Sequence, residues 1–164
     1  MPTTPIIEHL IVKVATDHGL PPTLVRAMVM VESGGDTFAT RYEPGFFEKY
    51  VRNDGSVKAF APCSLQTERV MRATSFGLMQ VMGQVARERG YLGPFLSSLC
   101  DPATGLQFGC LHLAAFRRRF AGLGWDAVCA AYNGGAGAVR GQHEFRNPDY
   151  PAKVLKALGG VWPE

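Results

Sequence analysis

One carboxylate stands where an apolar helical run breaks. The segment MVMVESGGDT, residues 28 to 37, places Glu32 at the end of a hydrophobic stretch, and Ser33 and two glycines follow at once. The negative end of a helix dipole and apolar neighbours both disfavour the charged form of a carboxyl. Both effects raise its pKa and keep the proton on, which a general acid for glycosidic cleavage requires. Taken alone, a glutamate that closes a helix is usually an ordinary solvated residue.

Two further segments with polar side chains follow Glu32 in order. ATSFGLMQVM, residues 73 to 82, contains Ser75 and Gln80, and AAYNGGAGAV, residues 130 to 139, contains Tyr132 and Asn133. Each segment also has an ordinary structural interpretation, because Tyr132 could be a core aromatic and Asn133 a helix cap. Which interpretation applies depends on the elements that position these residues.

The apolar periodicity predicts a mainly α-helical domain around these segments. We expect an amphipathic helix within the first 20 residues and a second helix, apolar nearly all round, from about Thr23 to Glu32. Asp101 followed by proline is typical of a helix start. We expect four more helices, within residues 77–90, 101–120, 124–135 and 147–160.

Residues 36–72 differ from the rest of the chain because they are polar, aromatic and rich in turn signals. TRYEPGFFEKYV places β-favouring aromatics around Pro44-Gly45, and Asp54-Gly55 offers a second turn. We therefore expect a small insertion that forms a strand or a β-hairpin, with irregular loops. With no repeat or linker in the sequence, residues 1–164 are expected to form a single domain.

The three polar segments together resemble the catalytic domain of soluble lytic transglycosylases, which belongs to the lysozyme-like superfamily. The helix end ESGG, the GLMQ segment and the AYN segment occur in the family's order. LCDPATGLQFGCLHLAAF resembles the family's aspartate-proline helix, and NPDYPAKVLKAL resembles its closing tyrosine helix. The resemblance covers roughly residues 5 to 160, apart from the insertion.

The resemblance implies a role for each matching residue near the catalytic carboxyl. Glu32 matches the family's single catalytic acid and base. Tyr132 matches a tyrosine whose hydroxyl approaches that carboxyl, and Asn133 matches an asparagine that helps to hold sugar or loop geometry.

Three residues of the middle segment are candidates for substrate binding by the same resemblance. Gln80 matches the glutamine of GLMQ, whose amide lies along the saccharide groove. Ser75 stands where a serine usually precedes the GLMQ glycine, with Phe76 replacing a smaller residue. Met79 lies inside the motif and could equally be plain core.

The insertion is the clear departure from the family pattern, and it contains a second candidate carboxylate. RYEPGFF looks like a segment seen in some phage and bacterial muramidase-like enzymes. If Glu43 projects into the cleft, the site has two carboxylates, which inverting hydrolases hold roughly 6.5–9.5 Å apart. Alternatively, Glu43 pairs with Arg41 or Lys49 on the surface. Both alternatives remain open.

The function implied by the resemblance is cleavage of the β-1,4 bond between N-acetylmuramic acid and N-acetylglucosamine in peptidoglycan. A lytic transglycosylase would leave 1,6-anhydromuramic acid ends. One alternative is a hydrolytic muramidase, a lysozyme or endolysin with Glu43 as its second carboxylate. An alternative of another class is an inactive wall-binding component of a phage or secretion apparatus. No cofactor or metal is expected, because no ligand spacing joins the four histidines, His9, His18, His112 and His143.

Composition and charge are those of an ordinary globular domain, and the mildly basic balance would suit an acidic polymer as partner or be plain surface charge. The 164 residues are 46% hydrophobic and 19% charged, with a net charge of +3 and a pI near 8.8. This charge is far from the dense basic stripe of a nucleic-acid binder, and no apolar run approaches the length of a membrane helix. We expect a monomer that acts in the periplasm or cell wall. Since no signal peptide is recognised, we expect either holin-dependent release, as for a phage endolysin, or export by a leader absent from this sequence.

Overall fold

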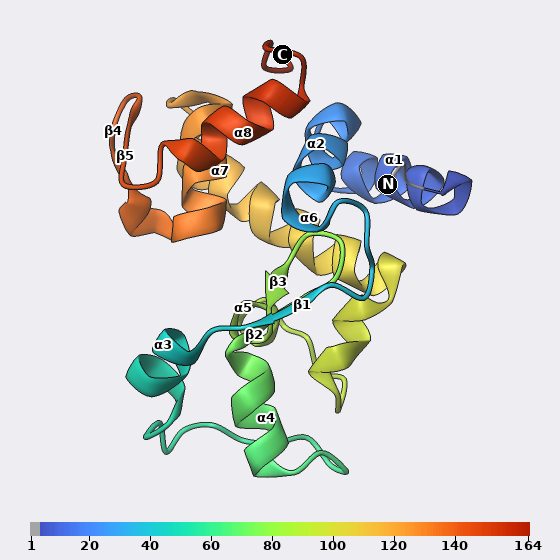
Figure 1. The fold of residues 1–164 in the computed structure, drawn as a ribbon, viewed down its shortest axis with the longest axis vertical. Helices are drawn as coiled ribbons and strands as arrows, with labels where there is room; N and C mark the ends of the chain where they lie inside the picture. The colour runs from blue at the N-terminus through green and yellow to red at the C-terminus, as the bar shows by residue number, and fades with distance from the viewer. Residues whose placement is uncertain (1–3) are drawn as a thin grey trace.

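The computed structural model describes residues 4–164 and is mainly α-helical (Figure 1). Residues 1–3, the start of the expected single domain and of its amphipathic segment, lie outside the described part. Figure 1 shows one group of helices at one end of the molecule and a smaller β-containing region at the other. The helices of the first group are α1 (Pro5–Asp17), α2 (Pro22–Ser33), α6 (Pro102–Arg119), α7 (Gly124–Gly134) and α8 (Asp149–Ala157).

The ends of two helices follow the signals in the sequence. The Asp101 side chain accepts a hydrogen bond from the Thr104 backbone N–H at 2.8 Å, and proline occupies the first turn of α6. Helix α2 begins at Pro22 and ends where Gly34 adopts a left-handed conformation with φ of 63°. Glu32 therefore lies in the last turn of α2, as predicted.

The β-structure differs from the expected hairpin. Strand β1 (Thr40–Tyr42) lies in the insertion, but it pairs antiparallel with β2 (Thr74–Phe76), which follows the insertion. Strand β2 also pairs with β3 (Val81–Met82), giving the order β1-β2-β3. The predicted strand within residues 36–72 is therefore confirmed, but the hairpin alternative is wrong, because the partner of β1 lies more than thirty residues further along the chain.

Most of the insertion between β1 and β2 is helical. Pro44 begins a short helix instead of occupying a turn, and a π-helical turn follows directly. These elements are α3 (Pro44–Phe46), the π-helix η1 (Phe47–Val51) and α4 (Leu65–Arg72). This region has a small hydrophobic cluster of its own, formed by the buried residues Val51, Val57 and Ala73.

The GLMQ segment is a turn, whereas the sequence predicted a helix from Gly77. Gly77 has φ of 71°, and a Cβ placed there would lie 2.5 Å from the carbonyl oxygen of Leu99. Gln80 also has a positive φ, of 47°. Helix α5 (Gly83–Glu88) begins only after β3. The close approach to Leu99 requires a glycine and a tight turn at this point. The hydrophobic pattern of residues 77–90 does not reveal this contact, because Leu99 lies outside that segment.

The remaining elements complete the surroundings of the helical core. They are two 3-10 turns, η2 (Leu96–Cys100) and η3 (Ala136–Ala138), and a small sheet of β4 (Val139–Gly141) and β5 (Glu144–Phe145). The four cysteines are free, and Cys110 and Cys129 lie buried in the core. No helix within residues 4–164 has the length and apolarity needed to cross a membrane.

Candidate active site

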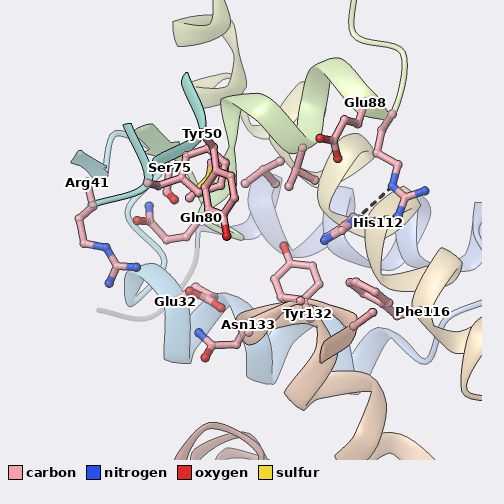
Figure 2. A pocket seen from close by; sticks show the side chains of 18 of the residues that line it. Glu32, Arg41, Tyr50, Ser75, Gln80, Glu88, His112, Phe116, Tyr132 and Asn133 are labelled. Atoms are coloured by element: carbon pink, nitrogen blue, oxygen red, sulfur yellow. Dashed lines mark hydrogen bonds between the residues drawn. The ribbon is translucent and has the colours of Figure 1, made fainter. Parts of the chain in front are cut away.

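A cavity of about 590 Å³ lies between the end of α2, the insertion, and helices α5, α6 and α7 (Figure 2). Five of the seven predicted site residues line it: Glu32, Ser75, Gln80, Tyr132 and Asn133. The structure therefore brings together side chains that are about a hundred residues apart in the sequence. In Figure 2, Glu32 and Tyr132 both point into the cavity.

Glu32 has an environment that favours the protonated form of a carboxyl. Its side chain is half-buried, and this burial raises its pKa. A hydrogen bond from Tyr150 and the positive charge of Arg41 act in the opposite direction, but they do not cancel the effect of burial. The predicted direction of the pKa shift is therefore confirmed, with desolvation as its main cause.

The tyrosine bonded to the carboxyl is Tyr150, where the resemblance had implied Tyr132. The Tyr150 hydroxyl, on helix α8, donates to Oε1 of Glu32 at 2.5 Å. The Tyr132 hydroxyl donates instead to the backbone carbonyl of Met79 at 2.8 Å. Burial and the nearby charge of Glu32 raise the pKa of both tyrosines well above the usual value, so both hydroxyls remain donors. The resemblance included the tyrosine helix but gave Tyr150 no place in the site.

Ser33 fixes the helix end that carries Glu32, a role that the sequence analysis missed. Its hydroxyl contacts the carbonyl oxygens of Val29 at 3.1 Å and Leu78 at 2.9 Å, and it accepts from the Gly35 N–H at 3.2 Å. The end of α2 is thus tied to the GLMQ turn. These bonds restrict the movement of Glu32 relative to the opposite wall of the cavity.

Ser75 lines the cavity from β2, and Gln80 lines it from the turn directly before β3. The Gln80 side-chain nitrogen donates to the carbonyl oxygens of Ala39 at 2.9 Å and Gly77 at 3.1 Å. This nitrogen therefore holds the start of the insertion against the GLMQ turn. Ser75, almost fully buried on β2, lies opposite Arg41 of β1 in the strand register.

Met79 does not fit its expected role in substrate binding. Its side chain is fully buried, and a Cβ added at Gly109 of α6 would lie 2.5 Å from its sulfur. The side chain packs in the core against α6, and only the backbone carbonyl serves the site, as acceptor for Tyr132. The burial of Met79 therefore favours its interpretation as a core residue.

Asn133 is exposed at the end of α7 and lines the cavity. Its side-chain oxygen accepts from Nδ2 of Asn147 at 2.8 Å, and the same nitrogen reaches the Ala130 carbonyl at 3.1 Å. Asn147 was not predicted as a site residue. Its hydrogen bond sets the orientation of the Asn133 amide and does not use the Asn133 side-chain nitrogen.

Glu43 is engaged by a neighbour on the insertion. Nε of Arg41 donates to Oε1 of Glu43 at 2.5 Å, and the two side chains are 69% and 32% exposed. Arg41 lines the cavity, whereas Glu43 is not among the described residues that do. The structure thus matches the surface-pair alternative, and it places a cation at the mouth of the cavity near Glu32.

The rest of the cavity wall was not predicted. The insertion contributes Phe46 and Tyr50, whose rings lie 5.0 Å apart. Helix α5, the residue directly after it and helix α6 contribute a further group consisting of Val85, Glu88, Arg89, His112, Phe116 and Arg119. The apolar residues of this group look like ordinary core residues in the sequence, so no local signal marked them. Among residues 4–164, no three histidine, cysteine, aspartate or glutamate side chains gather as metal ligands would.

Comparison with known proteins supports the expected resemblance. The model of the family described as Transglycosylase SLT domain matches residues 9–149. The fold resembles that of the lytic transglycosylase Slt from Pseudomonas aeruginosa, whose X-ray structure is of an inactive mutant with glutamine in place of a glutamate. The TM-score is 0.62 at 18% sequence identity, with 94% of this chain and 25% of that chain covered. This chain thus spans about a quarter of the length of the solved relative, and the expected mainly α, lysozyme-like fold is confirmed.

Proposed function

Because the chain belongs to the transglycosylase SLT domain family, we propose that it is a lytic transglycosylase of peptidoglycan. Its proposed substrate is the β-1,4 bond between N-acetylmuramic acid and N-acetylglucosamine, and Glu32 is its general acid and base. The observation that carries this proposal is a half-buried carboxyl with a raised pKa, held by Tyr150 in the wall of a cavity. This substrate implies action in the periplasm or cell wall.

The hydrogen bond from Tyr150 supports different roles for the two oxygens of Glu32. The Tyr150 O–H donates to Oε1, so the carboxyl proton resides on Oε2. In the first step this proton moves to the glycosidic oxygen while the bond from that oxygen to C1 of the muramic acid breaks. Positive charge then develops at C1, next to the carboxylate that has just formed on Glu32.

In the second step, the Glu32 carboxylate takes the proton of the muramic C6 hydroxyl. The C6 oxygen attacks C1, the ring closes, and Glu32 regains its proton. The products are an N-acetylglucosamine with a free 4-hydroxyl and a 1,6-anhydromuramic acid end, and no water is consumed. One carboxyl with a raised pKa is sufficient for both proton transfers.

The pairing of Glu43 with Arg41 supports the transglycosylase over a hydrolase. A hydrolase of the two-carboxylate type needs a free carboxylate that activates water across the cleft. Here Nε of Arg41 donates a hydrogen bond to Oε1 of Glu43, so this carboxylate is not free. The positive charge of Arg41 also stabilises the Glu32 carboxylate that forms in the first proton transfer.

The activity is tested by clearing of a peptidoglycan-containing gel. We expect clearing by the wild type and none by Glu32→Gln, which keeps the shape but removes the acid. A matched control is Glu48→Gln, since Glu48 is exposed, pairs with Arg52 and does not line the cavity. Clearing by Glu32→Gln at the wild-type rate would refute Glu32 as the acid, and absence of clearing by the wild type on any wall preparation would favour the inactive wall-binding alternative.

A further inference from the structure

His112 and Arg89 meet at the end of the cavity away from Glu32. His112 lies on α6, and Arg89 directly follows α5. Nε and Nη2 of Arg89 lie 3.2 and 3.1 Å from Nδ1 of His112 (Figure 2). Figure 2 shows His112 beside Tyr132, and the centroids of the two rings lie 5.4 Å apart.

This contact fixes the tautomer of His112. A guanidinium group can only donate hydrogen bonds, so Nδ1 must accept and cannot carry a proton. The neutral imidazole then has its single proton on Nε2. Burial, together with the positive charge of Arg89, lowers the pKa of His112 to about 4, which keeps the ring neutral at physiological pH.

The proton on Nε2 is available to a ligand. His112 lines the cavity, and within residues 4–164 its Nε2 has no hydrogen-bond partner in the protein. A donor in a partly buried wall loses free energy unless an acceptor reaches it. The wall at His112 is therefore complementary to a ligand that brings one hydrogen-bond acceptor.

The surroundings of His112 add an apolar surface to this donor. The ring of Phe116 meets the imidazole edge-on at 4.6 Å between centroids, and Phe116 is almost fully buried. Val85 lines the cavity one helical turn before Arg89. A carboxylate ligand would need a guanidinium group. Two nitrogens of Arg89 point at His112, the guanidinium of Arg119 lies over the Phe120 ring, and the carboxylate of Glu88 lines the same cavity.

We propose that His112, oriented by Arg89, is a specificity-determining residue that binds the acetamido group of an N-acetylated sugar. Nε2–H donates to the acetamido carbonyl, and the methyl group packs against Phe116 and Val85. The identity of the ligand as an N-acetylated glycan rests on the proposed function. The tautomer of His112 follows from the Arg89 contact alone.

The first experiment measures the imidazole nitrogen shifts of the intact protein by NMR. We expect His112 to be neutral at pH 5.5 with its proton on Nε2, and we expect Arg89→Met to raise its pKa from about 4 towards the ordinary value of about 6.5. A proton on Nδ1, or titration of the wild-type ring near 6.5, would overturn the proposal. This readout needs no glycan and no activity.

The second experiment measures binding of two neutral trisaccharides, the N-acetylglucosamine trimer and cellotriose, which has hydroxyls in place of the acetamido groups. We expect the wild type to prefer the acetylated trimer, and His112→Phe to weaken that binding about tenfold without changing cellotriose binding. His112→Gln, which keeps an N–H donor, should restore part of the loss.

Two results of the binding experiment would overturn the proposal. One is an equal loss for both sugars in His112→Phe, and the other is a wild type that does not prefer the acetylated trimer. The outcome is separate from that of the proposed function, because acetamido preference without wall cleavage would refute only the activity. Wall cleavage without this preference would refute only the role of His112.

Discussion

Replacing the buried Glu68 by glutamine tests how the insertion is attached to the rest of the fold. Glu68 on α4 is fully buried, and its carboxylate accepts from Arg72 and Arg87, which lies on α5. Helix α5 also leads into Arg89 at the cavity wall. The Glu68 cluster therefore connects the insertion to the element that positions the far end of the site.

The expected loss of stability follows from burial and from the number of contacts. Nε of Arg72, Nε of Arg87 and Nη2 of Arg87 each lie 2.8 Å from a Glu68 oxygen, and the arginine side chains are only 13% and 5% exposed. Glu68→Gln keeps the volume but leaves two buried guanidinium groups without a negative partner. Removal of one member of a buried ion cluster costs about 3–5 kcal/mol.

Urea or thermal unfolding provides the assay. For a chain of this length, that loss corresponds to a decrease in Tm of roughly 6–20 °C. Glu48→Gln is the matched control, because Glu48 also pairs with an arginine four residues away but is 54% exposed, and it should cost about 1 kcal/mol or less. A loss for Glu68→Gln no larger than that of the control would refute the assigned role of the cluster.

The same cluster predicts a dependence of stability on pH. Burial alone would raise the pKa of Glu68, but the hydrogen bonds and charges of Arg87 and Arg72 together outweigh it and lower the pKa below the ordinary 4.5. A carboxyl with a depressed folded-state pKa stabilises the fold above its unfolded-state pKa, and this contribution is lost as the pH falls through the folded-state value. Wild type should therefore lose this stabilisation below about pH 4.5, whereas Glu68→Gln should lack this part of the decrease.

Three further substitutions test the site and its supports. Tyr150→Phe removes a hydrogen bond that lowers the pKa of Glu32, so the alkaline limb of the kcat/KM profile should move to higher pH, and an unchanged profile would contradict this. Met79→Ala should cost about 2–5 kcal/mol in urea unfolding, as for a fully buried core residue, and a change in KM alone would restore its binding role. Gly77→Ala should lower Tm and activity together, because its Cβ would lie 2.5 Å from the Leu99 carbonyl oxygen at a positive φ; wild-type Tm would refute this.

The parts of the fold that local signals determine were predictable from the sequence. The end of α2 at Glu32 and the start of α6 at Asp101 depend on prolines, glycines and a cap within a few residues. Desolvation of Glu32 was also indicated, because its apolar neighbours lie on the same helix.

The parts that depend on distant contacts were not predictable. The bond of Tyr150 to Glu32 joins residues 118 positions apart, and β1 pairs with a strand beyond the insertion. The turn at Gly77 depends on its contact with Leu99. The His112 tautomer depends on Arg89 from another element, so a scattered histidine gave no signal in the sequence.

Mass spectrometry of the muropeptides released from purified peptidoglycan tests the central claim most directly. The wild type should release fragments that end in 1,6-anhydromuramic acid, each lighter by one water than the corresponding hydrolysis product, and Glu32→Gln should release none. Ordinary reducing ends would contradict the transglycosylase mechanism and indicate a hydrolase, for which Glu43→Gln would be the decisive next variant.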